Sequence, residues 1–371
     1  MSGVDDNDRA IDGSLPADPA KGTKQVAEAP RLRTAHDLLA GAMSRAFSRE
    51  PVRSCPTGHH ELDEMTGGIL PGWCWVVAAV TNWGKSTFAT ALADVNLRAG
   101  RLPLIVSLED AEEIYADRLL LRRARRAPNR KINADNLRLR RLTPDELQLV
   151  TEVVNDAERK PMFLDARGRK GEWIARALEH TLDNVPVDLV ILDYLGEVRS
   201  GKRQQDRRNE VSEMAALIRG AVKSRNRSLV MLSQITIDDD ADKFPRMHQV
   251  RDSRDVVNAA EVVAMCGIPK SDVMGKDGRV KARAGERAML LEKVKQGRKG
   301  MVQLHWDDEA ACFVDVEDPR ASPEPPEPPE PPLGRSWSPT EKAPAPPPPH
   351  WQDAAEREDL GGFAQDGFGG L

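Results

Sequence analysis

Short, continuous apolar runs alternate between residues 51 and 317 with longer stretches whose apolar residues recur at helical spacing. The apolar runs predict strands at 73–80, 102–108, 161–166, 187–194, 228–234, 261–267 and 288–294. The periodic stretches predict helices at 85–99, 110–126, 143–159, 172–184 and 205–226. This alternation is typical of an α/β fold, in which helices flank both faces of a mostly parallel, twisted sheet. Residues 301–306 and 311–316 predict an antiparallel hairpin at the edge of that sheet.

A further helix is predicted ahead of this block. Thr34 stands three residues before Asp37, which is the spacing of a capping box. The apolar residues that follow recur at helical spacing over 35–48. The apolar stripe of this amphipathic helix leaves two interpretations open, because it can pack on a core of its own or dock on a neighbouring subunit.

The two ends of the chain have the composition of disordered segments. Residues 1–30 are polar and rich in Asp, Pro and Gly, which predicts disorder. The tail from residue 319 holds 14 of the 27 prolines, and such a segment favours extended polyproline II structure. We favour a solvated spacer; the alternative is a partner-binding tip that carries Trp351, Phe363 and Phe368.

Composition adds several limits. Aromatic residues make up 4% of the chain, so the core must be mainly aliphatic. No apolar run approaches the roughly 18 residues of a membrane span, and the acidic N-terminus lacks the apolar stretch of a secretory signal. The cysteines show no metal-binding spacing and predict reduced core thiols in a cytoplasmic protein; they are Cys55, Cys74, Cys266 and Cys312.

The net charge of −5 is unevenly distributed. Residues 318–371 carry −6, residues 1–50 carry −1, and the block between them carries +2. Because phosphate contacts are local, a chain that is acidic overall can still bind nucleic acid. The charge therefore neither requires nor excludes DNA as a partner.

The sequence AVTNWGKST at 79–87 follows a predicted strand and opens a predicted helix. In that context the turn amides face phosphate groups, Lys85 supplies a cation to the β- and γ-phosphate oxygens, and Ser86 coordinates Mg²⁺. The P-loop consensus begins with glycine where this chain has Ala79, and a Gly-Lys-Ser tripeptide alone also fits an ordinary helix start with an exposed lysine. The predicted nucleotide-binding residues are Ala79, Val80, Thr81, Asn82, Trp83, Gly84, Lys85, Ser86 and Thr87.

Three more candidate side chains follow the ends of predicted strands. Asp193 ends VDLVILD and is expected to hold Mg²⁺. Glu109 follows IVSL and can polarise an attacking water, and Gln234 ends VMLSQ and can contact a γ-phosphate. Each also has an ordinary interpretation, as a strand end, a helix-cap neighbour or a surface amide. Ligands of open parallel sheets bind at the carboxyl ends of the strands, so the combination favours a nucleotide site.

The order of these motifs resembles the C-terminal RecA-like ATPase domain of the DnaB-type replicative helicases. Residues 57–73 look like the segment that precedes the family's P-loop, SLED (107–110) resembles its strand-end glutamate motif, and LVILDYL (189–195) resembles its Walker B strand. The resemblance covers residues 51–317. It implies a RecA-like P-loop NTPase with ATP and Mg²⁺ as cofactors, in a homo-hexameric ring with ATP between neighbours.

In that family a basic pair from the adjacent subunit completes each site. Residues 291–302 match this region and place Lys293 and Lys295 at the two basic positions. The second position is usually arginine, which offers a planar fork that lysine lacks, so nearby Arg298 is the alternative. The ordinary interpretation is a solvated basic hairpin.

The resemblance also implies DNA contact through two loops. The first, 198–210, follows the Walker B strand, and the second, 249–261, resembles a family loop in which Arg254 replaces glycine. Such loops track the DNA backbone electrostatically, although a single run of arginines is more often a solvated surface. The candidate DNA-binding residues are Arg199, Lys202, Arg203, Arg207, Arg208, Arg251 and Arg254.

The resemblance implies an ATP-dependent, ring-forming helicase or translocase that acts on single-stranded DNA during replication. The alternatives are a RecA- or KaiC-like DNA-dependent ATPase without unwinding, and an ATP-gated loader or adaptor whose tail recruits replication proteins. The expected segments are a disordered 1–33, a linker helix in 34–50, an ATPase domain at 51–317 and a disordered tail at 318–371. Family members normally carry an N-terminal helical domain, so collar formation and primase contact through such a domain are not expected here.

Overall fold

The computed structural model describes residues 33–48, 50, 52–127, 131–157, 163–201, 206–235, 244–250, 254–275 and 277–316. The chain divides into two compact units, Met1–Glu317 and Asp318–Leu371, and all described residues belong to the first. The predicted disorder at 1–30 and in the proline-rich tail lies outside the described residues.

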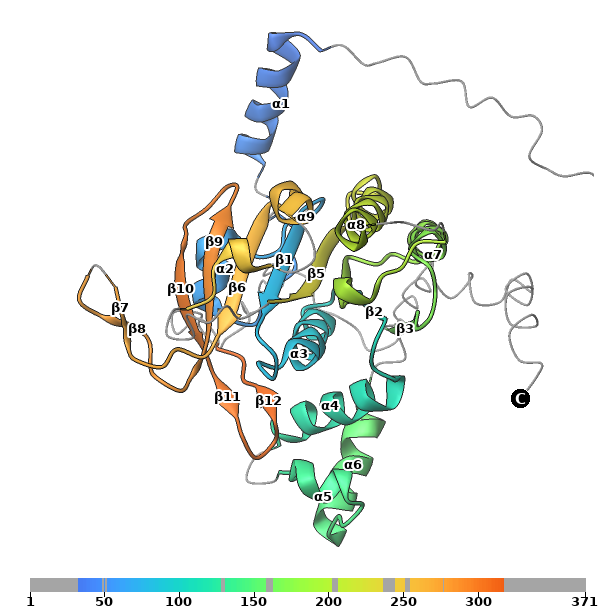
Figure 1. Ribbon diagram of the computed structural model, residues 1–371, viewed down its shortest axis with the longest axis vertical. Coiled ribbons are helices and arrows are strands. Elements are labelled where there is room, and N and C mark those ends of the chain that lie inside the picture. Colours follow the sequence, from blue (N-terminus) through green and yellow to red (C-terminus); the bar gives the residue numbers. More distant parts are fainter. Residues whose placement is uncertain are drawn as a thin grey trace, which may run out of the picture. The chain divides into compact units, whose positions relative to one another are not determined.

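An eight-stranded sheet with the order β10-β9-β6-β1-β5-β4-β2-β3 forms the centre of the domain (Figure 1). Its strands are β1 (Cys74–Ala79), β2 (Pro103–Ser107), β3 (Phe163–Asp165), β4 (Leu189–Asp193), β5 (Ser228–Gln234), β6 (Val262–Gly267), β9 (Arg287–Val294) and β10 (Gly300–Leu304). Strands β1 to β6 pair in parallel, whereas β9 and β10 form antiparallel pairs at one edge. The predicted α/β architecture is confirmed.

The segments that form the antiparallel edge differ from the prediction. Residues 301–306 and 311–316 were expected to pair, but β10 pairs with β9. The reason is the turn between them: Gly297 has a φ of 144°, so the chain reverses before residue 311 is reached. The predicted partners keep only the short hairpin of β11 (Trp306–Asp307) and β12 (Cys312–Phe313), which forms a separate sheet. Another small hairpin, β7 (Val273–Met274) and β8 (Val280–Ala282), was not predicted.

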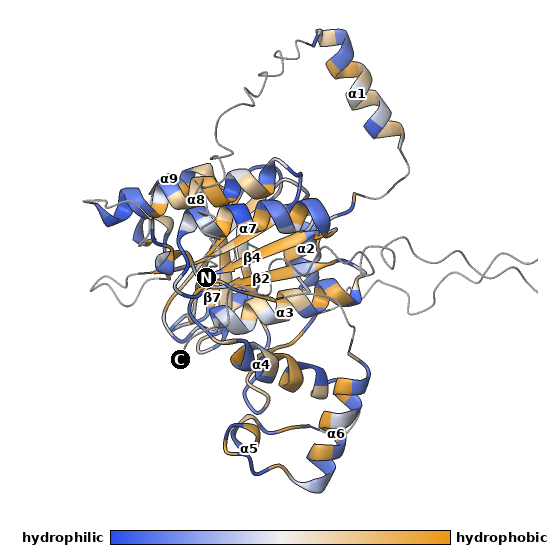
Figure 2. Ribbon diagram, turned by 90° about the vertical axis from the view of Figure 1, so that its right-hand side faces the viewer, coloured by the Kyte–Doolittle hydropathy of each residue, from blue (hydrophilic) through white to orange (hydrophobic). Residues whose placement is uncertain are grey.

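Helices cover both faces of the sheet. The helices α7 (Gly171–Asn184), α8 (Arg207–Lys223) and α9 (Arg254–Ala259) cover one face, whereas α2 (His60–Thr66) and α3 (Lys85–Arg98) pack on the other. Successive residues of a strand point to opposite faces, so Val76 joins the first core and Val77 joins the second. Burial on both faces explains the continuous apolar runs, which are seen as orange strands between the helices in Figure 2.

A small helical cluster follows β2. It consists of α4 (Glu112–Ala124), α5 (Ala134–Arg138) and α6 (Pro144–Asn155), around a core that includes Leu121, Ile132 and Leu149. The five-residue α5 was not predicted, because it is too short to show helical periodicity. The helix α6 begins with a capping box between Thr143 and Glu146.

The helix predicted at 35–48 is present as α1 (Ala35–Phe47), with the expected capping box between Thr34 and Asp37. None of its residues is buried, and the side chains of Leu38, Leu39, Met43 and Phe47 are all more than half exposed. The four cysteines are free and buried, which confirms the prediction of core thiols. Among the described residues, no helix combines the length and the apolar character that a membrane span requires.

Candidate active site

The turn at 80–84 connects the end of β1 to the start of α3. The amide of Trp83 donates to the carbonyl of Val80 at 3.3 Å, and the amide of Phe88 donates to the carbonyl of Gly84 at 2.8 Å. Asn82 and Gly84 have φ values of 64° and 104°, so two left-handed residues fold the chain back before the helix begins. The turn and the first amides of α3 therefore form the concave backbone that binds phosphate groups in such loops.

The predicted polar side chains lie at the same edge of the sheet as this turn. Ala79 is in register with Gln234 on β5, and Ser107 is in register with Asp193 on β4, so Glu109 follows β2 beside the end of β4. The amide nitrogen Nε2 of Gln234 donates to Oγ1 of Thr81 at 2.9 Å, which ties the end of β5 to the turn. The structure thus brings these predicted residues together.

Asp193 is 1% exposed, and its two carboxylate oxygens differ in their hydrogen bonding. The hydroxyl of Tyr115 on α4 donates to Oδ2 at 2.5 Å, whereas Oδ1 is buried and receives no hydrogen bond of normal geometry from the described residues. Burial raises the pKa of Asp193, and the hydroxyls of Tyr115 and Ser86 offset only part of this effect. An orphaned carboxylate oxygen beside Ser86 suits a hard cation such as Mg²⁺, which prefers oxygen ligands.

Glu109 is exposed, and the charged side chains at the same end of the sheet influence its pKa. Partial burial and the neighbouring carboxylates of Asp110 and Asp193 raise its pKa, while the ammonium of Lys85 opposes the rise. The Nζ atom of Lys85 lies 5.7 Å from the ring centroid of Tyr194, the residue after Asp193. A carboxylate with a raised pKa is a stronger base, which is the property that activation of a water molecule requires.

Aromatic side chains from β11 and β12 pack against Trp83 of the phosphate turn. Trp83 is fully buried, and its ring centroid lies 5.0 Å from that of Phe313 on β12. Trp306 on β11 contacts Phe313 with its ring edge, also at 5.0 Å between centroids. The guanidinium of Arg287 lies 3.5 Å from the Trp306 ring centroid and donates to the carbonyl of Trp83 at 2.9 Å. We call this group the P-loop clamp: Trp83, Phe88, Arg287, Trp306 and Phe313.

Tyr115 and the clamp residues outside the turn, Phe88, Arg287, Trp306 and Phe313, were missed by sequence reasoning. Trp83 was among the predicted nucleotide-binding residues, but its side chain is fully buried in the clamp. The chain has two tyrosines, and both contact the predicted site, Tyr115 through Asp193 and Tyr194 through Lys85. That scarcity was an available signal. Arg287 offered no local signal, because it lies 204 residues from the carbonyl that it contacts.

Lys293 and Lys295 do not join the phosphate turn of their own chain. Strand β9 runs antiparallel to β6, so Val294 at its end is in register with Val262 at the start of β6. The two lysines therefore lie at the amino-terminal ends of the parallel strands, whereas Lys85 lies at the carboxyl-terminal ends. Lys293 donates to the carbonyl of Asn258 at 2.6 Å, and its burial lowers its pKa. Lys295 lies 3.9 Å from the buried carboxylate of Glu261. Arg298, the alternative, is exposed in the turn after β9.

Only part of the predicted DNA-binding set lies within the described residues. Arg207 contacts Glu210 at 2.6 Å and the carbonyl of Gly196 at 2.6 Å, so its guanidinium is engaged within the chain. Arg199 and Arg208 are exposed. Lys202, Arg203, Arg251 and the side chain of Arg254 lie outside the described residues.

Comparison with known proteins identifies relatives over the same region. The family model of the DnaB-like helicase C terminal domain matches residues 54–315. The chain is 28% identical to the replicative DNA helicase DnaB of Geobacillus stearothermophilus, over 72% of this chain and 57% of that protein. It is 31% identical to the replicative DNA helicase DnaB of Leifsonia xyli subsp. xyli, over 70% of this chain and 56% of that protein. The chain therefore spans little more than half the length of these curated relatives.

Solved structures share the fold. A solved ATPase domain has a TM-score of 0.64 at 19% identity, covering 76% of this chain and 99% of that one. A DnaB-like replicative helicase, solved in a study of its interactions with primase, also has a TM-score of 0.64 at 19% identity, covering 78% of this chain and 68% of that one. At this level of identity the likeness concerns the fold alone.

Proposed function

Because the chain belongs to the family of DnaB-like helicase C-terminal domains, we propose that it is an ATP-dependent, ring-forming DNA helicase or translocase that acts on single-stranded DNA during replication. The observation that carries the proposal is the buried Oδ1 atom of Asp193, which lacks a hydrogen-bond partner among the described residues and lies at the same sheet edge as the phosphate turn. Leaving such an atom unsatisfied costs roughly 1–3 kcal/mol, so a bound cation is favoured there.

The residues of this edge divide the work of ATP hydrolysis. The amides of the 80–84 turn and the Lys85 ammonium would hold the phosphate groups, and Ser86 and Asp193 would hold Mg²⁺. Mg²⁺ usually takes few protein ligands besides phosphate oxygens and water, and it neutralises charge on those oxygens. Glu109 orients a water molecule toward the γ-phosphate and accepts its proton, aided by its raised pKa.

A neighbouring subunit completes the site in this proposal. Lys293 and Lys295 lie at the sheet edge opposite their own phosphate turn, which suits a role in trans. Lys295 is 63% exposed and can reach a second chain. In a ring, its charge would stabilise the negative charge that develops on the transferred phosphoryl group. The exposed apolar stripe of α1 supplies a surface for docking between subunits.

In this proposal Gln234 couples ATP hydrolysis to DNA. Its amide contacts Thr81 in the phosphate turn, and the next residue, Ile235, forms a β-bridge with Val250 in the loop predicted to contact DNA. Loss of the γ-phosphate would move the turn and, through this connection, residues 249–258. Exposed basic residues such as Arg199 and Arg208 then contact the DNA backbone without reading its sequence.

The test is ATP turnover with and without single-stranded DNA at two salt concentrations, together with strand displacement on a forked duplex. Lys85→Ala is expected to abolish turnover, whereas Lys281→Ala on β8 serves as a matched control that retains it. DNA should stimulate turnover, and the stimulation should weaken as salt rises. Turnover that DNA does not stimulate, with no strand displacement, would favour the loader or adaptor and refute the helicase.

A further inference from the structure

A charged cavity lies away from the phosphate turn. It has a volume of about 200 Å³ and is lined by Arg98, Arg122, Arg125, Arg126, Phe313, Val314 and Asp315. Arg98 ends α3, the helix that Lys85 begins. Fourteen residues of helix separate the two sites by about 20 Å, so the cavity is distinct from the nucleotide site.

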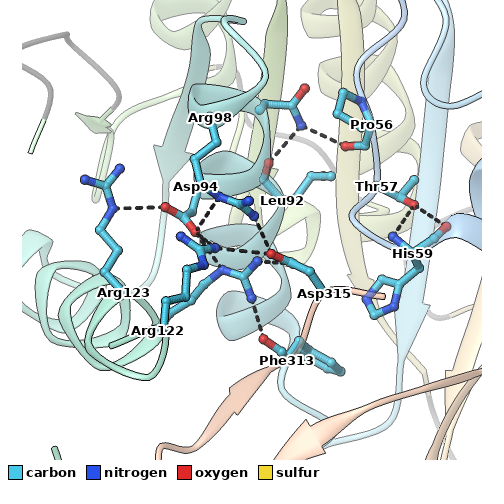
Figure 3. A network of polar contacts seen from close by, with 12 residues as sticks. Pro56, Thr57, His59, Leu92, Asp94, Arg98, Arg122, Arg123, Phe313 and Asp315 are labelled. Carbon is cyan, nitrogen blue, oxygen red and sulfur yellow. Dashed lines mark hydrogen bonds and ion pairs between the residues drawn. The ribbon is translucent and has the colours of Figure 1, made fainter. Parts of the chain in front are cut away.

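A buried ion cluster lies next to the cavity and shares Arg98, Arg122 and Asp315 with its lining (Figure 3). Asp94 on α3 has no exposed surface and accepts hydrogen bonds from Arg122, Arg123 and Arg126, all on or next to α4. Burial alone would raise the pKa of Asp94, but the arginines, Arg126 foremost, hold it below its usual value. Asp94 is therefore ionised, and its charge is shared by four guanidinium groups, because Arg98 also lies 3.8 Å from its carboxylate.

Two further carboxylates of the described residues pair with the arginines of the cavity. Asp315 accepts hydrogen bonds from Arg98, Arg122 and Arg126, and Asp307 pairs with Arg125 at 2.6 Å. Among the described residues, the four arginines that line the cavity are held by three carboxylates, those of Asp94, Asp307 and Asp315. Each guanidinium carries five N–H donors, more than the carboxylates can accept.

The arginines differ in how far they reach solvent. Arg122 is 3% exposed and fixed by Asp94, Asp315 and the carbonyl of Phe313, so it is a structural member. Arg98, Arg125 and Arg126 keep between 34% and 38% of their side chains exposed. The buried ion cluster therefore holds a rim of partly exposed guanidinium groups in place.

We propose that this cavity, the arginine pocket, binds a phosphate group. Planar guanidinium groups bind phosphate oxygens in pairs, and the volume suits one phosphate group and its first waters. The same chemistry has two sources, free inorganic phosphate and a terminal phosphate on a nucleic acid. The proposal does not depend on the proposed function, because the arginines that would bind the phosphate group are not residues of the nucleotide site. Phe313 of the P-loop clamp also lines the pocket but supplies no charge.

The test uses the full-length chain with Lys85→Ala, which removes phosphate binding at the nucleotide site. Calorimetric titration with inorganic phosphate at constant ionic strength is expected to show one saturable site. Adding Arg125→Gln should weaken that binding at least tenfold, and Arg138→Gln, which alters an exposed arginine on α5 outside the pocket, should not. Arg125 contacts neither Asp94 nor Asp315, so its substitution leaves the buried ion cluster intact.

Two results would overturn the proposal. One is the absence of saturable phosphate binding in the Lys85→Ala protein, and the other is binding that Arg125→Gln and Arg98→Gln both leave unchanged. A second arm compares oligothymidylate with and without a 5′-phosphate. A preference for the phosphorylated strand that Arg125→Gln removes supports the proposal and identifies nucleic acid as the source, whereas binding of inorganic phosphate alone supports it with a free anion.

Discussion

Substitution of Asp94 tests how much the buried ion cluster contributes to stability. In Asp94→Asn the side chain keeps its shape but loses the charge that faces Arg122, Arg123 and Arg126. Removal of one partner of a buried ion pair lowers the free energy of unfolding by about 3–5 kcal/mol. Asp315 still contacts Arg122 and Arg126 in the variant, so we expect about 3 kcal/mol, the lower end of that range.

Urea unfolding followed by tryptophan fluorescence measures this change. With a slope of about 3 kcal/mol per molar urea, the midpoint falls by about 1 M. The control is Asp135→Asn, because Asp135 pairs with Arg138 where both side chains are more than two-thirds exposed, and such pairs contribute about 0–1 kcal/mol. A midpoint that falls no further in Asp94→Asn than in this control would refute the stabilising role of the cluster.

We also predict that the difference in unfolding free energy between wild type and Asp94→Asn depends on pH. The pKa of Asp94 lies below its usual 3.8 in the folded chain. The carboxylate therefore contributes its full stabilisation above about pH 4 and loses it as the pH falls through the depressed pKa. The difference in unfolding free energy between wild type and Asp94→Asn should be constant near neutral pH and shrink in acid. A difference that is unchanged at pH 2 contradicts this assignment.

Three further substitutions test the candidate site through ATP turnover. Tyr115→Phe removes a hydrogen bond to the charged Asp193, and such a bond contributes about 1.5–3 kcal/mol. We therefore expect the variant to require more Mg²⁺ for turnover, and the acid limb of its pH–rate profile to move to higher pH. Asp110→Asn removes a charge that raises the pKa of Glu109, so the acid limb moves to lower pH. Trp306→Ala loosens the P-loop clamp, and KM for ATP rises about tenfold, or ~1.4 kcal/mol; an unchanged KM contradicts the clamp.

The fold was predictable where buried residues follow a regular pattern along the sequence. Strands buried on both faces, such as β1 and β4, have continuous apolar sequences, and their alternation with helices specified the parallel sheet. The family resemblance over residues 51–317 is confirmed by the match at 54–315. The edge pairing was wrong because apolar runs do not specify partners. The turn at Gly297 decides between the candidate hairpins, and its effect depends on backbone geometry.

The candidate site was predictable at the strand ends but not beyond them. Parallel strands deliver their carboxyl ends to one edge, so Glu109, Asp193 and Gln234 could be grouped before their contacts were seen. Tyr115 could not be assigned in this way, because its contact with Asp193 depends on how α4 crosses the sheet edge. The arginines at 122–126 likewise resemble a solvated helix face in the sequence, whereas Arg122 is 3% exposed.

The departure of the phosphate turn from the P-loop consensus has a structural explanation. Ala79, at the position where glycine is usual, is the last residue of β1 and is in register with both Gln234 and Cys266. It has no positive φ, so the position does not require glycine, and the left-handed residues are Asn82 and Gly84. A Cβ atom on Gly84 would lie 3.4 Å from the rings of both Trp306 and Phe313. The shape of the turn therefore depends on Arg287, Trp306 and Phe313 of the P-loop clamp, which lie more than 200 residues away in the sequence, and not on the local motif alone.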